Sequence, residues 1–98
     1  MRNLKATNAF KKDMRIVSQY KSFDPEFFDK CLNNLKNNES LPNRCKDHKL
    51  SKTSPKKYQG FRDFHIAPDI CVLYEIRSND VILQRIGKHN NLQLTEDV

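Results

Sequence analysis

The chain is expected to fold as one α+β domain over residues 1–98, with two N-terminal helices packed on a small, mostly antiparallel sheet. Three observations predict this class. Apolar residues recur at helical spacing in the first third of the chain and alternate at strand spacing in the last third. Turn signals stand at residues 67–69 and 77–80. A chain of 98 residues without an internal repeat is long enough for one compact domain.

The first elements are a short strand at residues 2–6 and a helix that Thr7 or Asn8 can cap. The apolar stripe of this helix consists of Phe10, Met14, Val17 and Tyr20. Basic residues fall between the stripe positions, which is typical of a solvated face. The pattern predicts an amphipathic helix of about three turns.

A second helix is marked at its start by Asp24 as N-cap and Pro25 at the first helical position. Its apolar stripe consists of Phe27, Cys31, Leu32 and Leu35. The polar run 37–40 and then Pro42 end it. Because the link between the two helices is short, they are expected to pack as an antiparallel hairpin.

The rest of the chain changes from a basic loop to strands. Residues 43–58 carry six lysines and arginines against one acid, and we expect at most a short strand there. Residues 58–66 alternate, so Phe64 and Ile66 share one face while Asp63 and His65 share the other. Further strands are predicted at 70–76 and 81–86, followed by a loose acidic tail.

The formal net charge of +6 favours nucleic acid, an acidic protein or an anionic membrane surface as partner. No apolar run approaches the roughly 20 residues that span a bilayer, and the N-terminus lacks the apolar stretch of a signal peptide. Three cysteines without a Cys-x-x-Cys pair fit reduced thiols better than disulfides. We therefore expect a cytoplasmic protein with no membrane partner.

Three histidines, His48, His65 and His89, stand beside carboxylates on this basic chain, and histidine can both take and give a proton near neutrality. The joint pattern predicts general acid–base chemistry on a polyanion. Asp63 lies two residues before His65 on a strand, so its carboxylate can orient that imidazole. The alternative is a polar surface pair on an exposed strand.

Arg85 lies near the end of a predicted strand, four residues before His89. A guanidinium can grip a phosphate through two hydrogen bonds and neutralise charge that builds at phosphorus. In the alternative interpretation Arg85 pairs with a carboxylate across the sheet and His89 is merely exposed.

Other chemistries are disfavoured. The chain has no Gly-x-Ser-x-Gly motif, and its two glycines exclude glycine-rich nucleotide loops. Cys45 and His48 have the spacing of half a zinc site, but no second half exists at ligand spacing. We therefore expect no metal and no cofactor.

Three blocks, residues 46–50, 60–69 and 85–89, resemble the YafQ-type toxins, a branch of the RelE/ParE superfamily of bacterial toxin–antitoxin modules. The resemblance covers essentially the whole chain. It implies an endoribonuclease that cuts messenger RNA in the ribosomal A site and so stops translation. A cognate antitoxin would silence it, and operator DNA would be bound only through that complex.

Carried over by position, the resemblance implies a set of catalytic residues: His48, His65, His89, Asp63, Asp69 and Arg85. The basic side chains expected to contact RNA are Lys46, Lys49, Lys52, Lys56, Lys57 and Arg62. The family often has aromatic residues where this chain has Ile70 and Gln93. Because aromatic rings stack on bases, this departure bears on codon preference and rate.

The expected reaction is metal-independent attack of the RNA 2′-hydroxyl on the adjacent phosphorus, with one imidazole or Asp69 as base, another histidine as acid and Arg85 stabilising charge. Three rivals remain: a relative that poisons DNA gyrase, a non-catalytic nucleic-acid-binding protein, and a degenerate toxin that binds its antitoxin without cleaving RNA.

Overall fold

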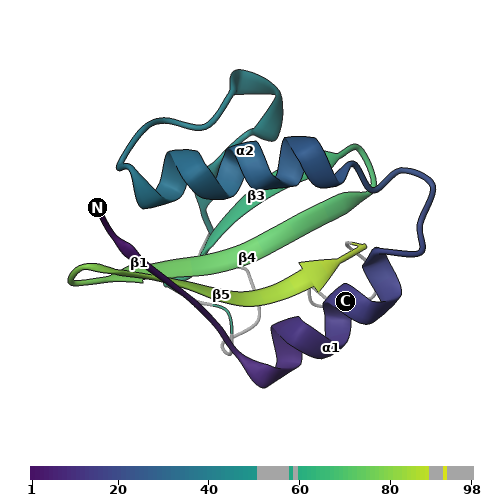
Figure 1. Cartoon of the computed structure of the whole chain (residues 1–98), viewed down its shortest axis with the longest axis horizontal. Coiled ribbons are helices and arrows are strands. Elements are labelled where there is room, and N and C mark those ends of the chain that lie inside the picture. The colour runs from purple at the N-terminus through teal and green to yellow at the C-terminus, as the bar shows by residue number, and fades with distance from the viewer. Residues whose placement is uncertain (51–57, 59, 89–91, 93–98) are drawn as a thin grey trace.

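The computed structural model describes residues 1–50, 58, 60–88 and 92, and it has two helices on one face of a five-stranded sheet (Figure 1). The helices are α1 (Asn8–Val17) and α2 (Pro25–Lys36), and a short 3-10 turn, η1, follows at Asn43–Cys45. The strands are β1 (Asn3–Ala6), β2 (His48–Lys49), β3 (Arg62–Ala67), β4 (Ile70–Arg77) and β5 (Asp80–Gly87). The predicted α+β class is confirmed.

Both helices begin at the caps that the sequence indicates. The Thr7 hydroxyl accepts a hydrogen bond from the Phe10 amide at 3.1 Å, and the Asp24 carboxylate accepts one from the Phe27 amide at 3.2 Å. Each bond satisfies an amide that the first helical turn leaves without an intrahelical partner. Within the described residues, no helix is long and apolar enough to cross a bilayer.

The strands lie in the order β1-β5-β4-β3-β2, with β1 parallel to β5 and every other pair antiparallel. The short β2 covers only the start of β3, where His48 faces Asp63 and Lys49 faces Arg62. The predicted strand at residues 58–66 begins at Arg62 instead. Gly60 has a φ of 90°, which breaks the extended backbone before β3.

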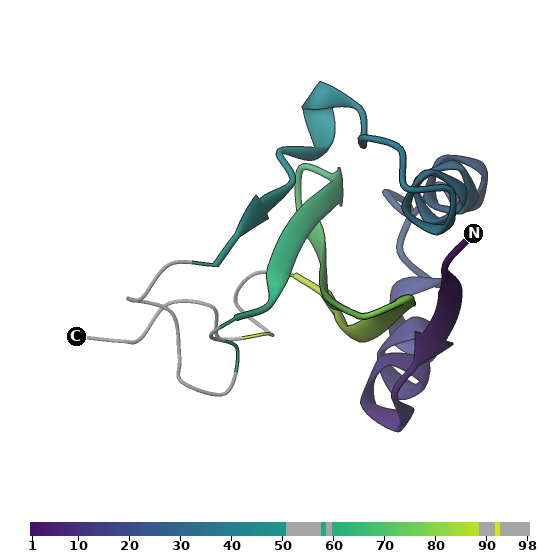
Figure 2. The same ribbon diagram turned by 90° about the vertical axis from the view of Figure 1, so that its left-hand side faces the viewer.

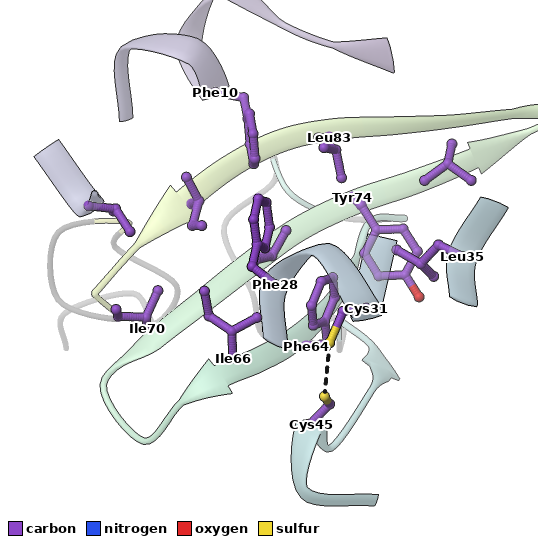
Figure 3. Packing of buried hydrophobic residues seen from close by; sticks show 14 residues of the cluster. Phe10, Phe28, Cys31, Leu35, Cys45, Phe64, Ile66, Ile70, Tyr74 and Leu83 are labelled. Carbon is purple, nitrogen blue, oxygen red and sulfur yellow. Dashed lines mark hydrogen bonds between the residues drawn. The ribbon is translucent and has the colours of Figure 1, made fainter. Parts of the chain in front are cut away.

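The main core fills the space between the helices and the sheet (Figure 3). Phe10 of α1 stacks on Phe28 of α2 with ring centroids 6.4 Å apart, and Phe64 meets Tyr74 edge-on at 5.6 Å. The buried thiols of Cys31 and Cys45 lie 3.7 Å apart and join α2 to η1. Burial raises the pKa of Cys31 to about 12, so this thiol stays protonated at neutral pH.

The two helices do not form the predicted hairpin. Figure 2 shows them on the same side of the sheet, and α1 packs along β5. Within the described residues their backbones approach at few points, and they meet through Phe10 and Phe28. The reason is that each apolar stripe is buried against the sheet, which leaves no second stripe for the neighbouring helix.

Candidate functional site

Four of the side chains predicted to carry chemistry lie on the sheet face opposite the main core, and they are His48, Asp63, His65 and Arg85. Alternation along β3 places Phe64 and Ile66 in the core and Asp63 and His65 on the other face, as predicted. Across the sheet Asp63 pairs with Leu73, and Leu73 pairs with Arg85. Arg85 is therefore on the same face as Asp63 and two strands away, a separation of about 10 Å.

A buried carboxylate lies between two imidazoles at one edge of this face. Oδ2 of Asp63 is 3.8 Å from Nε2 of His48 and 3.9 Å from Nε2 of His65. The Asp63 side chain is 2% exposed, whereas His48 and His65 are 53% and 24% exposed. The carboxylate is thus shielded from solvent, while both imidazoles remain accessible to a substrate.

A backbone contact fixes the orientation of His48. Its Nδ1 lies 2.6 Å from the carbonyl oxygen of Lys46, and because a carbonyl can only accept, Nδ1 donates this hydrogen bond. Lys46 has a φ of 51°, the left-handed conformation that directs this carbonyl. Nε2 of His48 is therefore the nitrogen left to exchange a proton with a substrate.

Arg85 is held by Asp13 of α1, which the sequence interpretation did not single out. Nε and Nη2 of Arg85 donate to the two Asp13 oxygens at 2.6 and 3.0 Å, and Nη1 donates to the Tyr58 hydroxyl at 3.4 Å. The hydrogen bonds with Asp13 raise the pKa of Arg85 above its ordinary value. Arg85 thus pairs with a carboxylate, as in one of the two alternatives, but this carboxylate lies on α1 and not across the sheet. Asp13 is the one acidic residue of the basic helix α1, and this was the signal that could have revealed it.

Arg62, predicted to contact RNA, is joined to Asp47 and Tyr74. Its Nε donates to the Tyr74 hydroxyl at 3.2 Å and to the Asp47 carboxylate at 3.4 Å, and the Tyr74 hydroxyl donates to Asp47 at 2.7 Å. Burial by itself would lower the pKa of Arg62, yet these hydrogen bonds outweigh it and the pKa is raised. Arg62 therefore holds the segment that leads into β2 through its hydrogen bond with Asp47. Its contact with RNA stays a prediction.

Of the other predicted residues, Asp69 lies in a turn at the end of β3, two lysines flank His48, and four residues lie outside the described part of the chain. Asp69, in the turn between β3 and β4, accepts a hydrogen bond from the Ser22 hydroxyl at 3.2 Å. Lys46 and Lys49 are exposed beside His48. The residues outside the described part of the chain are Lys52, Lys56, Lys57 and His89.

In the described part of the chain, no three His, Cys, Asp or Glu side chains are arranged to hold a metal ion. Because His89 lies outside that part, the expected absence of a metal stays a prediction. Burial, with the Asp63 carboxylate as the second cause, raises the pKa of the neighbouring Cys71 to about 12. Cys71 is therefore a neutral thiol and not a nucleophile at neutral pH.

Comparisons with known proteins agree on one family. A family model described as the bacterial toxin of type II toxin–antitoxin systems, YafQ, matches residues 2–94. A metal-bound toxin from Helicobacter pylori is 30% identical with a TM-score of 0.79, and the match covers 94% of this chain and 99% of that one. YafQ from E. coli strain BL21(DE3) is 26% identical with a TM-score of 0.78, covering 94% of this chain and 98% of that one.

The E. coli DinJ–YafQ complex contains a chain 29% identical to this one, with a TM-score of 0.76 and coverage of 94% and 98%. No curated protein sequence matches the chain.

Proposed function

The chain belongs to the YafQ family of bacterial toxins of type II toxin–antitoxin systems, and from this premise we propose that it is an endoribonuclease. Its substrate is messenger RNA in the ribosomal A site, and cleavage there stops translation. The observation that carries the proposal is the buried Asp63 carboxylate between the accessible imidazoles of His48 and His65. Two proton-exchanging groups at one place are what phosphodiester cleavage needs.

The reaction begins with attack of the RNA 2′-oxygen on the adjacent phosphorus. A base, either a neutral imidazole or Asp69, takes the 2′-hydroxyl proton as the new oxygen–phosphorus bond forms. The bond from phosphorus to the 5′-oxygen breaks, and an imidazolium gives its proton to that oxygen. The products are a 2′,3′-cyclic phosphate and a 5′-hydroxyl, and water can open the ring to a 3′-phosphate.

Asp63 acts as a positioning residue in this scheme. Its carboxylate, 3.8 Å from Nε2 of His48 and 3.9 Å from Nε2 of His65, orients whichever histidine donates the proton. His48 works through Nε2, because its Nδ1 is bound to the Lys46 carbonyl. His89 remains the third proposed histidine.

Arg85 stabilises the charge that builds on the phosphoryl oxygens. A guanidinium has five N–H donors. Within the described residues, Asp13 and Tyr58 use three of those of Arg85. One N–H on each terminal nitrogen therefore remains, enough for a two-point grip on a phosphate.

Partners follow from the family premise and the charge. A cognate antitoxin binds and silences the toxin, as DinJ accompanies YafQ in the E. coli complex, and operator DNA is bound through that complex. The ribosome is docked through basic side chains, comprising Lys46, Lys49, Lys52, Lys56 and Lys57. The toxin acts in the cytoplasm, where translation takes place.

The test is cleavage of a defined message in a purified translation system. Wild type is expected to cut ribosome-bound message and leave 5′-hydroxyl ends, and His65→Gln is expected to slow cutting at least about 100-fold. Arg77→Gln removes a charge from the β4–β5 hairpin and is the control that keeps full activity. A 5′-phosphate end, or an unchanged rate for His65→Gln, would refute the mechanism. Loss of DNA supercoiling with intact translation would indicate a gyrase poison instead.

A further inference from the structure

A pocket of about 420 Å³ opens beside His65, between the start of α2, the η1 turn and the end of β3. Its volume falls within the range of small-molecule binding sites, about 300–1,000 Å³. The residues that line it are Phe27, Arg44, Lys46, His65, Ile66, Ala67 and Pro68. The chemistry described above does not use Phe27, Arg44 or the apolar floor of this pocket.

The charge of the pocket selects an anion. Arg44 and Lys46 are both exposed at its wall, and His65 adds an imidazole. Among the described residues that line it, none carries a carboxylate. A phosphate group placed here would meet two cations and no like charge.

The pocket also offers a stacking platform. The Arg44 guanidinium lies over the Phe27 ring, 3.6 Å from the ring centroid. This contact holds the guanidinium against the ring, and both residues line the pocket. Arginine planes, like aromatic rings, are surfaces on which unpaired RNA bases stack.

Two features connect the pocket to the residues proposed to cleave RNA. Lys46 lines the pocket, and its carbonyl oxygen accepts the hydrogen bond from His48. His65 belongs both to the pocket wall and to the pair with Asp63. The register of β3 against β4 shifts between His65 and Ala67, and such irregularities re-aim side chains at functional sites. A ligand in the pocket therefore lies beside His65.

We propose that this pocket binds one nucleotide of the RNA substrate, next to the phosphodiester that is cleaved. The base stacks on the Arg44 guanidinium that Phe27 supports, and the phosphate lies near Lys46. The proposal rests on the proposed function and extends it to the recognition of a neighbouring nucleotide. Arg44 and Phe27 provide the stacking surface that Ile70 and Gln93, at the positions often aromatic in the family, do not provide.

The experiment titrates the folded protein with each of the four ribonucleoside 5′-monophosphates, observed by amide and methyl NMR. We expect concentration-dependent shifts at Phe27, Arg44, Ile66 and Ala67. Inorganic phosphate, the second probe, is expected to move Lys46 without moving Phe27. Shifts that are the same for phosphate and nucleotides would overturn the stacking proposal, as would nucleotide shifts located elsewhere.

Three variants sharpen the test. Arg44→Gln and Phe27→Leu are each expected to weaken nucleotide binding about 5- to 10-fold, the lower end of what loss of one stacking contact costs. Arg77→Gln removes the same charge as Arg44→Gln at a distant hairpin and should bind like wild type. Equal weakening in Arg44→Gln and Arg77→Gln would reduce the effect to net charge and refute the pocket. The NMR spectra themselves report whether each variant is folded.

Binding and cleavage are read separately, so the two proposals can fail separately. If wild type cuts ribosome-bound message but nucleotides leave the pocket unshifted, the pocket proposal fails and the nuclease stands. If nucleotides bind the pocket but no message is cut, the nuclease proposal fails, and with it the assignment of the bound nucleotide as substrate.

Discussion

Replacing Asp13 with asparagine tests whether the contact between α1 and β5 contributes to stability through its charge. The Asp13 carboxylate accepts hydrogen bonds from Arg85 at 2.6 and 3.0 Å, and from the Ile86 amide at 3.1 Å. Asparagine keeps the shape and one acceptor oxygen. It loses the charge and turns an amide N–H₂ toward the guanidinium, which is itself a donor.

The magnitude follows from the exposure of the pair. The Arg85 and Asp13 side chains are 31% and 14% exposed, so this ion pair is partly buried. Exposed ion pairs contribute about 0–1 kcal/mol, and breaking a fully buried pair costs about 3–5 kcal/mol, so the cost for this pair lies between the two. We therefore expect the free energy of unfolding to fall by about 2 kcal/mol. For a domain of this size each kcal/mol lowers Tm by about 4–8 °C, so Tm should fall by about 8–16 °C.

The assay is urea unfolding followed by circular dichroism, on the two single variants Asp13→Asn and Arg85→Gln and on the double variant. A coupling energy of about 1–2 kcal/mol is expected from this double-mutant cycle. The control is Arg77→Gln, since Arg77 is 71% exposed and pairs with Glu75 of its own strand. The loss of stability for this variant should stay below about 0.5 kcal/mol. Equal losses for Asp13→Asn and the control, with no coupling, would refute the reasoning.

The remaining predictions concern pH, metal, salt and a helix cap. The pKa values of the buried Cys31 and Cys71 thiols are raised from 9.0 to about 12. Above pH 9 the unfolded chain therefore binds fewer protons than the folded chain, and the free energy of unfolding falls as the pH rises. Unfolding measured at a series of alkaline pH values should show a shallower fall for Cys71→Ala than for wild type. Toxin that has been dialysed against EDTA and then freed of the chelator should cut ribosome-bound message at an unchanged rate, and a large loss that added metal restores would contradict metal-independent chemistry. The affinity for ribosomes should fall at least about tenfold between roughly 50 and 200 mM salt, because several contacts between lysines and phosphates release counterions. Sedimentation assays measure this affinity. Asp24→Ala removes the cap of α2 and should cost about 1 kcal/mol in thermal unfolding.

Local chemistry made much of the fold predictable from the sequence. Thr7 and Asp24 cap their helices through bonds to amides three residues ahead, so the signal and its effect lie in the same short stretch. The alternation of residues 63–66 likewise determined which face each side chain takes. By contrast, the start of β3 depends on the positive φ of Gly60, which the alternation of apolar residues does not reveal. The separation of the helices depends on the sheet, because it buries the apolar stripes of both α1 and α2.

The candidate site was predictable where partners are close in sequence or on one strand. Asp63 and His65 lie two residues apart, and the structure pairs them. The carboxylate that binds Arg62 lies 15 residues away in the sequence, and the one that binds Arg85 lies 72 residues away. Nothing in the sequence next to either arginine indicates these carboxylates. Asp13 is noticeable only after the fold places α1 beside β5, because a carboxylate on a basic helix also reads as an ordinary surface charge.

The parallel pairing of β1 with β5 has a consequence for synthesis of the chain. Asn3 pairs with Asp80 and Ala6 with Leu83, so β1 cannot pair until β5, far along the sequence, has been made. Contacts between residues so distant in sequence form late and slowly. Until β5 has been made, α1 has no strand to pack against and Asp13 cannot form its ion pair with Arg85. Until β1 pairs with it, β5 is exposed along one edge. The contact that positions Arg85 is therefore expected to form only after residues 80–87 have been made.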